Sequence, residues 1–220
     1  MTTTRILHHA DAITWLSQMR APLRGASIVT SMPDVSEYPR FSLEEWKAWF
    51  TNAARLVLSC CPPDGVTIFY QTDIKKNGVW LDKSFLCQKV AAETGDELIA
   101  HKIICRSPPG VTSFGRIGYS HLLCFSKTIR PDTSNSSADV LPQAGPTTWT
   151  RGMGLEACRL ACEFIKTNTT SHTILDPFCG HGTVLGVAND FGFHAIGVDR
   201  SLKCIRKAKS VKTGPLDCKI

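Results

Sequence analysis

The sequence predicts a doubly wound α/β domain around a mostly parallel sheet of seven strands, with an antiparallel hairpin at one edge. Between residues 172 and 199, an apolar strand, a glycine-rich turn, a helix and a second apolar strand follow one another. Two further runs at residues 98–105 and 119–125, joined by a segment rich in Ser, Pro and Gly, are typical of a hairpin. Shorter apolar runs alternate with helical patterns in the first half, at residues 5–9, 26–30 and 66–71.

The first third of the chain supplies two strands and a long helix. Residues 11–16 begin a turn and a helix after the first strand, and the second strand runs directly into residues 31–34. Ser42 and Glu45 form a capping box, which predicts that a helix starts there. Its apolar side chains recur at the spacing of one buried helix face: Trp46, Trp49, Phe50, Ala53, Leu56 and Val57.

The second half adds helices on both sides of the glycine-rich turn. Residues 127–148 are rich in Ser, Pro and Asp without periodicity, so we expect a mobile loop. Helices are expected at residues 152–166 and 201–209, and the chain beyond Thr213 is expected to fray.

Composition limits the possible partners and sites. The 220 residues suit one domain, and the net charge of +6 fits a polyanionic partner such as nucleic acid, although solvated basic faces would give the same value. The ten cysteines form no C-x-x-C pair, so we expect neither a metal site nor a disulfide framework. No run has the length of a signal peptide or a membrane span, so a cytoplasmic or nuclear protein without a membrane partner is expected.

The turn at residues 176–183 is the strongest signal of a binding site. Gly180 and Gly182 allow the backbone to approach a ligand, and the helix that starts near Thr183 directs free N–H groups toward an anion. Asp199 ends the next strand, where a carboxylate can accept both hydrogen bonds of a ribose diol. A nicotinamide site would need a third glycine and a P-loop would need Gly-Lys-Ser/Thr. The pattern therefore favours an S-adenosylmethionine pocket over these sites and over a purely structural turn.

In order and spacing, these segments resemble the amino-methyltransferases of nucleic acids, the DNA N4-cytosine and N6-adenine methylases, in a circularly permuted arrangement. Residues 176–183 are close to that family's D-P-F-x-G-x-G-T motif, and residues 28–34 resemble its I-V-T-D-P-P-Y motif. The resemblance covers most of the chain and implies a class I, Rossmann-like methyltransferase fold. It also implies one domain, residues 1–220, with a catalytic half at 1–127, a loop at 128–148 and a cofactor-binding half at 149–220.

The resemblance assigns a catalytic role to the turn of residues 31–34. Ser31 would accept one proton of the target amine through its oxygen and Met32 the other through its carbonyl, while Pro33 stiffens the turn. Asp34 stands where the family has an aromatic ring that stacks on the base. It would therefore accept a proton itself or be an ordinary surface turn residue, and the ring would come from another position. Candidates for that ring are Tyr38, Phe41 and Phe69.

Cofactor-binding roles are likewise carried over by position. Asp11 would face the adenine amino group or simply cap a helix, Phe178 would cover the cofactor, and Arg151 would close over the methionine moiety or form a salt bridge. His101 and His121 are interpreted as satisfied sheet histidines rather than catalytic bases. The full predicted cofactor set is Asp11, Arg151, Asp176, Pro177, Phe178, Gly180, Gly182, Thr183 and Asp199.

The function implied is S-adenosylmethionine-dependent methylation of a base nitrogen in nucleic acid. The chain has no room for a large target-recognition insert beyond residues 74–98 and 127–148, which favours RNA slightly over DNA because RNA loops present unpaired bases. Two alternatives stay open. The chain could be an inactive cofactor-binding and nucleic-acid-binding subunit of a partner protein, or it could methylate a protein or a small molecule.

Overall fold

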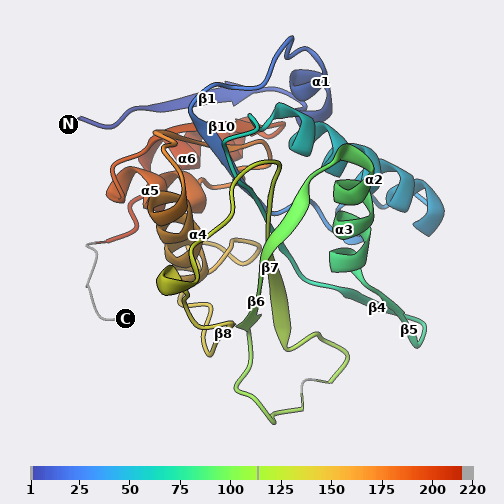
Figure 1. Cartoon of the computed structure of the whole chain (residues 1–220). Helices are drawn as coiled ribbons and strands as arrows, with labels where there is room; N and C mark the ends of the chain where they lie inside the picture. Colours follow the sequence, from blue (N-terminus) through green and yellow to red (C-terminus); the bar gives the residue numbers. More distant parts are fainter. Residues whose placement is uncertain (1, 113, 215–220) are drawn as a thin grey trace.

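The computed structural model of the chain describes residues 2–112 and 114–214. Its main sheet has eight strands in the order β1-β10-β9-β2-β3-β7-β6-β8 (Figure 1). The first five strands in that order run parallel, β7 is antiparallel to both its neighbours, and β8 is parallel to β6. The strands are β1 Arg5–His9, β2 Ala26–Thr30, β3 Thr67–Gln71, β6 Glu97–Cys105, β7 Tyr119–Ser126, β8 Val140–Leu141, β9 Thr173–Asp176 and β10 His194–Asp199.

Helices cover both faces of this sheet, as Figure 1 shows. Helices α4, α5 and α6 contribute to one apolar core, and α1, α2 and α3 contribute to the other. Two 3-10 turns, η1 Val35–Glu37 and η2 Thr133–Asn135, lie in connecting segments. The helices are α1 Ala12–Ser17, α2 Leu43–Cys60, α3 Lys83–Thr94, α4 Leu155–Asn168, α5 Thr183–Asp190 and α6 Leu202–Ser210.

Neighbouring residues of the central strands enter different cores because side chains alternate across a strand. Ile28 lies in the core under α2 and Val29 in the core under α4, and Ile174 and Leu175 divide in the same way. The predicted doubly wound α/β fold is thus confirmed. The capping box is confirmed too, since Ser42 and Glu45 each accept a backbone N–H of the other at the start of α2.

The predicted seven strands and the position of the hairpin need correction. The eighth strand, β8, lies inside the segment expected to be a loop. Because β8 pairs with β6, the edge of the sheet is β8 and not the β6–β7 hairpin. Two residues are too few to show a strand pattern. The Lys102 ammonium holds this segment by donating to the carbonyls of Ser137 and Ala138 at 3.0 and 3.1 Å.

Residues 74–94 hold elements that the sequence analysis left unassigned. A separate hairpin, β4 Ile74–Lys76 and β5 Val79–Leu81, precedes α3. Helix α4 starts at Leu155 rather than at residue 152. The tail predicted to fray lies almost entirely in residues 215–220, outside the described residues.

Eight of the cysteines are buried with free thiols. Among the described residues, no helix is long and apolar enough to cross a membrane.

Candidate active site

A cavity of about 300 Å³ opens at the carboxyl ends of β1, β10, β9 and β2. Residues from both halves of the chain line it, because β2 of the first half pairs with β9 of the second. Of the thirteen residues predicted from the sequence, eleven line the cavity: Asp11, Ser31, Met32, Pro33, Arg151, Asp176, Pro177, Phe178, Gly180, Thr183 and Asp199. Gly182 and Asp34 do not line it.

The turn between β9 and α5 has the left-handed backbone that its glycines allow, with φ of 50° at Gly180 and 80° at Gly182. The close approaches differ from those expected. A Cβ at Gly180 would lie 2.6 Å from the Trp149 ring, and one at Gly182 would lie 2.8 Å from the Cβ of Ala208. Both glycines are therefore required by packing inside the protein, whether or not a ligand is bound.

The Asp199 carboxylate is held in place by two backbone N–H groups. Its Oδ2 accepts the Gly180 N–H at 3.0 Å, and its Oδ1 accepts the Ser201 N–H at 2.7 Å. Each carboxylate oxygen can accept a second hydrogen bond. The carboxylate is thus preorganised to accept two further donors, such as the hydroxyls of a diol.

Asp176 ends β9 and is 3% exposed. The Thr30 hydroxyl donates to its Oδ1 at 2.7 Å, and the Phe178 N–H donates to the same oxygen at 3.1 Å. Burial dominates over these bonds and raises the pKa of Asp176 to about 7. The Thr30 bond joins the end of β2 to the end of β9, so it fixes the Ser31 turn beside the glycine turn.

Asp34 takes no part in the cavity wall. Its carboxylate caps η1 by accepting the Ser36 N–H at 3.0 Å, and it accepts the Lys83 ammonium at 3.1 Å. Burial opposes its charge, but Lys83 and the Ser36 N–H outweigh that effect and hold the pKa of Asp34 below its ordinary value. Both oxygens are engaged, so the structure places Asp34 as a residue that supports the turn from outside the cavity.

Tyr38 brings an aromatic ring to the cavity where the Ser31 turn itself lacks one. It lines the cavity, stacks on Phe41 at 5.0 Å between ring centroids, and has the Arg200 guanidinium 5.0 Å from its own ring centroid. Phe69, the third candidate for such a ring, is fully buried in the core. Tyr38 is therefore the candidate that reaches the cavity wall.

An ion pair connects the two halves of the chain across the cavity. The Arg151 guanidinium, in the segment before α4, lies 3.0 Å from the Glu37 carboxylate of η1, and both residues line the cavity. Nearby, the Trp149 ring stacks on His181 at 4.4 Å between centroids. The salt bridge considered for Arg151 is thus present, whereas Glu37, Trp149 and Arg200 are lining residues that were not predicted from the sequence.

Asp11 combines the two roles considered for it. Its Oδ1 accepts the Thr14 N–H at 3.0 Å as the N-cap of α1, and the residue also lines the cavity. Since His9 pairs with Asp199 in the sheet, Asp11 follows β1 directly beside the end of β10.

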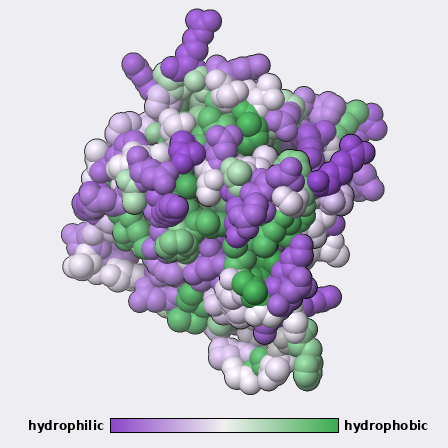
Figure 2. Space-filling model, turned by 90° about the vertical axis from the view of Figure 1, so that its right-hand side faces the viewer, coloured by the Kyte–Doolittle hydropathy of each residue, from purple (hydrophilic) through white to green (hydrophobic). Residues whose placement is uncertain are grey.

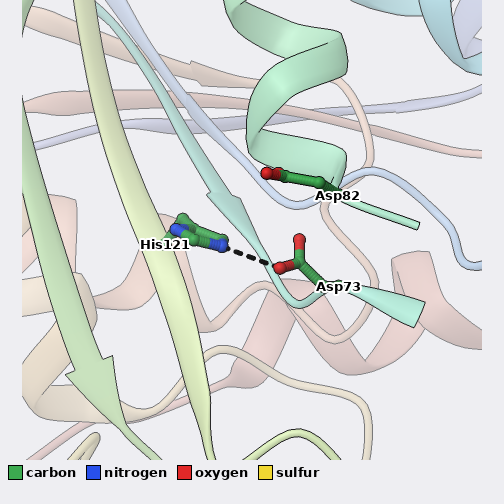
Figure 3. A group of neighbouring side chains, drawn as sticks. All are labelled: Asp73, Asp82 and His121. Carbon is green, nitrogen blue, oxygen red and sulfur yellow. Dashed lines mark hydrogen bonds and ion pairs between the residues drawn. The ribbon is translucent and has the colours of Figure 1, made fainter. Parts of the chain in front are cut away.

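A second polar cluster lies at the end of β3, the strand next to β2 in the sheet (Figure 3). His121 Nε2 lies 3.0 Å from Asp73 Oδ2, and His121 Nδ1 lies 3.0 Å from His101 Nε2, so both histidines are satisfied in the sheet. Asp73, Asp82 and His121 could together surround a metal ion. However, Asp73 Oδ2 already accepts the Trp80 indole N–H at 3.0 Å as well as facing His121, which leaves this oxygen no lone pair for a metal.

No protein-family model and no curated protein sequence matches the chain. Among solved structures, the chain is similar to a proposed DNA modification methylase from Thermus thermophilus in complex with S-adenosyl-L-methionine, with a TM-score of 0.70 and 19% identity over 94% of this chain and 92% of that one. It is also similar to the PvuII cytosine-N4-specific DNA methyltransferase, with a TM-score of 0.69 and 17% identity over 95% and 86% of the two chains. These similarities show that the chain has the Rossmann-like fold of class I methyltransferases.

Proposed function

We propose that this chain is an S-adenosylmethionine-dependent methyltransferase that modifies a nitrogen of a nucleic-acid base. The observation that carries the proposal is the meeting of two turns in one cavity. The Ser31 turn after β2 and the glycine turn after β9 are joined by the Thr30–Asp176 hydrogen bond and line the same cavity. The similar methylases, which include a complex with S-adenosyl-L-methionine and a cytosine-N4-specific enzyme, add support.

The residues present fit this cofactor. Asp199 is aligned by two backbone N–H groups and can accept the ribose hydroxyls, and Asp11 lies beside it at the end of the neighbouring strand. The buried Asp176 carboxyl lies close to the start of α5, and a bound ligand carrying an ammonium and a sulfonium group would favour its ionised form. When bound, the cofactor supplies an electrophilic methyl group.

The Ser31 turn would bind and orient the amine that accepts this methyl. The lone pair of an exocyclic amine is delocalised into the base, and it becomes directed when both amine protons are held by acceptors. Ser31 and the Met32 carbonyl provide two acceptors on adjacent residues, and Pro33 limits their motion. Tyr38, whose ring already packs against Phe41, Trp49 and Arg200, lines the same cavity and would contact the base.

The base must leave its helix to enter a cavity of this size. Unpaired bases are abundant in RNA loops, and the described residues include no large additional domain for reading duplex sequence, so we favour RNA over DNA as the substrate.

One observation favours a second candidate function. Asp34 is engaged by Lys83 and Ser36 instead of lining the cavity, so the turn lacks both the family's aromatic ring and a free carboxylate. A subunit that binds the cofactor and nucleic acid for a catalytic partner would tolerate this arrangement.

Two measurements separate these functions. Calorimetric titration with S-adenosylmethionine tests the cofactor site, and transfer of labelled methyl to total RNA, DNA and protein tests the reaction. We expect the chain to bind S-adenosylmethionine and to transfer labelled methyl to nucleic acid. Binding without transfer would support the subunit role, label in protein would change the acceptor, and a purified chain that does not bind the cofactor would refute both functions.

A further inference from the structure

The hairpin β4–β5 pairs only with itself among the described strands, and it contributes only Ile74 and Leu81, at its base, to the packing around the core under α2. Its two-residue turn, Asn77 and Gly78, has left-handed φ angles of 52° and 76°, the conformation that matches the twist of a tight hairpin. An isolated two-stranded sheet is only marginally stable in water. The hairpin therefore depends on whatever attaches it to the rest of the protein.

The polar attachment is Asp73, whose side chain is 2% exposed. Its Oδ2 accepts the indole N–H of Trp80 at 3.0 Å and lies 3.0 Å from His121 Nε2, and its Oδ1 accepts the Lys83 N–H at 2.9 Å. Figure 3 shows Asp73 directed at His121 beneath the start of α3. Together these bonds hold the hairpin, the first turn of α3 and strand β7 as one unit.

Trp80 is thereby fixed in orientation while it remains 48% exposed. Its neighbours Val79 and Phe85 are 68% and 60% exposed. Across the hairpin, Lys75 stands opposite Trp80 on the same face, whereas Lys76 and its partner Val79 belong to the other face. Lysines beside a rigid, exposed aromatic ring are the combination that binds single-stranded nucleic acid, because phosphates attract the ammonium groups while a base stacks on the ring.

The hairpin also lies next to the cavity. Lys83, two residues beyond β5, reaches the Asp34 carboxylate at 3.1 Å, and Asp34 directly follows Pro33 in the cavity wall. Figure 1 shows β4 and β5 at the lower right of the molecule, and Figure 2 turns that right-hand side to the viewer, where apolar and polar residues are interspersed. A strand that delivered a base to the cavity could therefore continue over the hairpin.

We infer that residues 74–81 bind unpaired nucleotides that flank the target base, with Trp80 stacking on one base and Lys75 and Lys76 contacting phosphates. This inference rests on the proposed function for the target base itself. Both faces of a paired base are covered by its neighbours, so the inference commits to a single strand. Lys75 beside the ring and Lys76 on the other face of the same short strand favour a polyanion over an apolar protein surface.

The test measures fluorescence anisotropy of a labelled single-stranded RNA or DNA oligonucleotide with the full chain. We expect Trp80→Ala to weaken binding about tenfold, as expected for the loss of one stacked base, while Trp80→Phe retains most of the affinity. The double variant Lys75→Ala/Lys76→Ala should reduce the slope of log affinity against log salt by about 1.4. The matched control is Lys209→Ala/Lys212→Ala, which removes the same charge at and beyond the far end of α6 and should leave the affinity within about twofold.

Three results would overturn the inference: no binding of single strands by the wild type, equal binding of a duplex of the same sequence, or unchanged affinity in Trp80→Ala. Cofactor affinity, measured in parallel, should be the same in every variant, which shows that each is folded. Binding that depends on Trp80 without methyl transfer would refute the proposed enzyme and support the hairpin inference. Methyl transfer that is unchanged in Trp80→Ala would support the proposed enzyme and refute the hairpin inference.

Discussion

Asp176 should make this protein less stable as the pH rises from acid to neutral. An aspartate in the unfolded chain has a pKa near 3.8, whereas burial raises the pKa of Asp176 to about 7 in the folded protein. Between these two values the folded state binds the extra proton, so each unit of rising pH lowers the free energy of unfolding by up to about 1.4 kcal/mol. The loss begins above pH 4 and is complete above pH 7, and its total is on the order of 4 kcal/mol.

The replacement Asp176→Asn isolates this effect. Both hydrogen bonds that Asp176 accepts, from Thr30 and Phe178, end on Oδ1, so an amide oxygen in the same place can accept them. The amide does not ionise. We therefore expect the variant to be similar to the wild type in stability near pH 4.5 and more stable than the wild type by several kcal/mol at pH 8.

Urea unfolding of both proteins at half-unit steps from pH 4.5 to 8 measures the difference directly. Other titrating groups cancel because they are common to the two proteins. If the two stability curves run parallel over this range, Asp176 does not have a raised pKa and the reasoning is wrong. A cationic cofactor favours the ionised carboxylate, so wild-type affinity for S-adenosylmethionine should rise with pH up to about 7 and be flat in the variant.

Other predictions concern the cavity wall. Asp199→Ala should weaken S-adenosylmethionine binding by more than tenfold in calorimetry, and an unchanged dissociation constant would remove its ribose role. Ser31→Ala should lower methyl transfer by about 10- to 100-fold with normal cofactor affinity, and full activity would exclude it as an amine acceptor. Asp34→Ala should destabilise the protein by about 1–3 kcal/mol in thermal unfolding, because Lys83 loses its partner, yet reduce transfer less than Ser31→Ala; a larger loss would restore a catalytic role to this carboxylate. Arg151→Gln, which breaks the pair with Glu37, should raise the KM for S-adenosylmethionine severalfold with kcat nearly unchanged, and a selective loss of kcat would contradict a binding role.

Much of the fold could be predicted because its signals are local. The strand boundaries at β1 and β2 and the capping box of α2 follow from residues that are neighbours in the chain. Two local signals were nevertheless missed. Asn77-Gly78 between two short segments that begin and end on apolar residues, Ile74 and Leu81, is a hairpin signal. Asp82 is a good N-cap for α3, whose buried face is made partly of small and polar side chains such as Ser84 and Cys87.

The predicted site was less complete than the fold, since lining residues come from segments far apart in sequence. Glu37 and Tyr38 line the cavity because η1 folds over it, and nothing in their immediate sequence shows this. Asp34 illustrates the opposite case. Its place in a recognisable turn suggested catalysis, whereas a partner 49 residues away, Lys83, engages its carboxylate.

The sequence by itself determined the chain's repeating strand–helix order, the turn that precedes α5 and the acid that ends β10, because each depends on backbone preferences and periodicity over a few residues. Only the tertiary structure decided which of the polar side chains face the cavity, which are neutralised by distant partners, and that Trp80 is held rigid at the surface. Those outcomes depend on burial and on pairing between distant segments. Such contacts form only once the sheet has brought the two halves of the chain together.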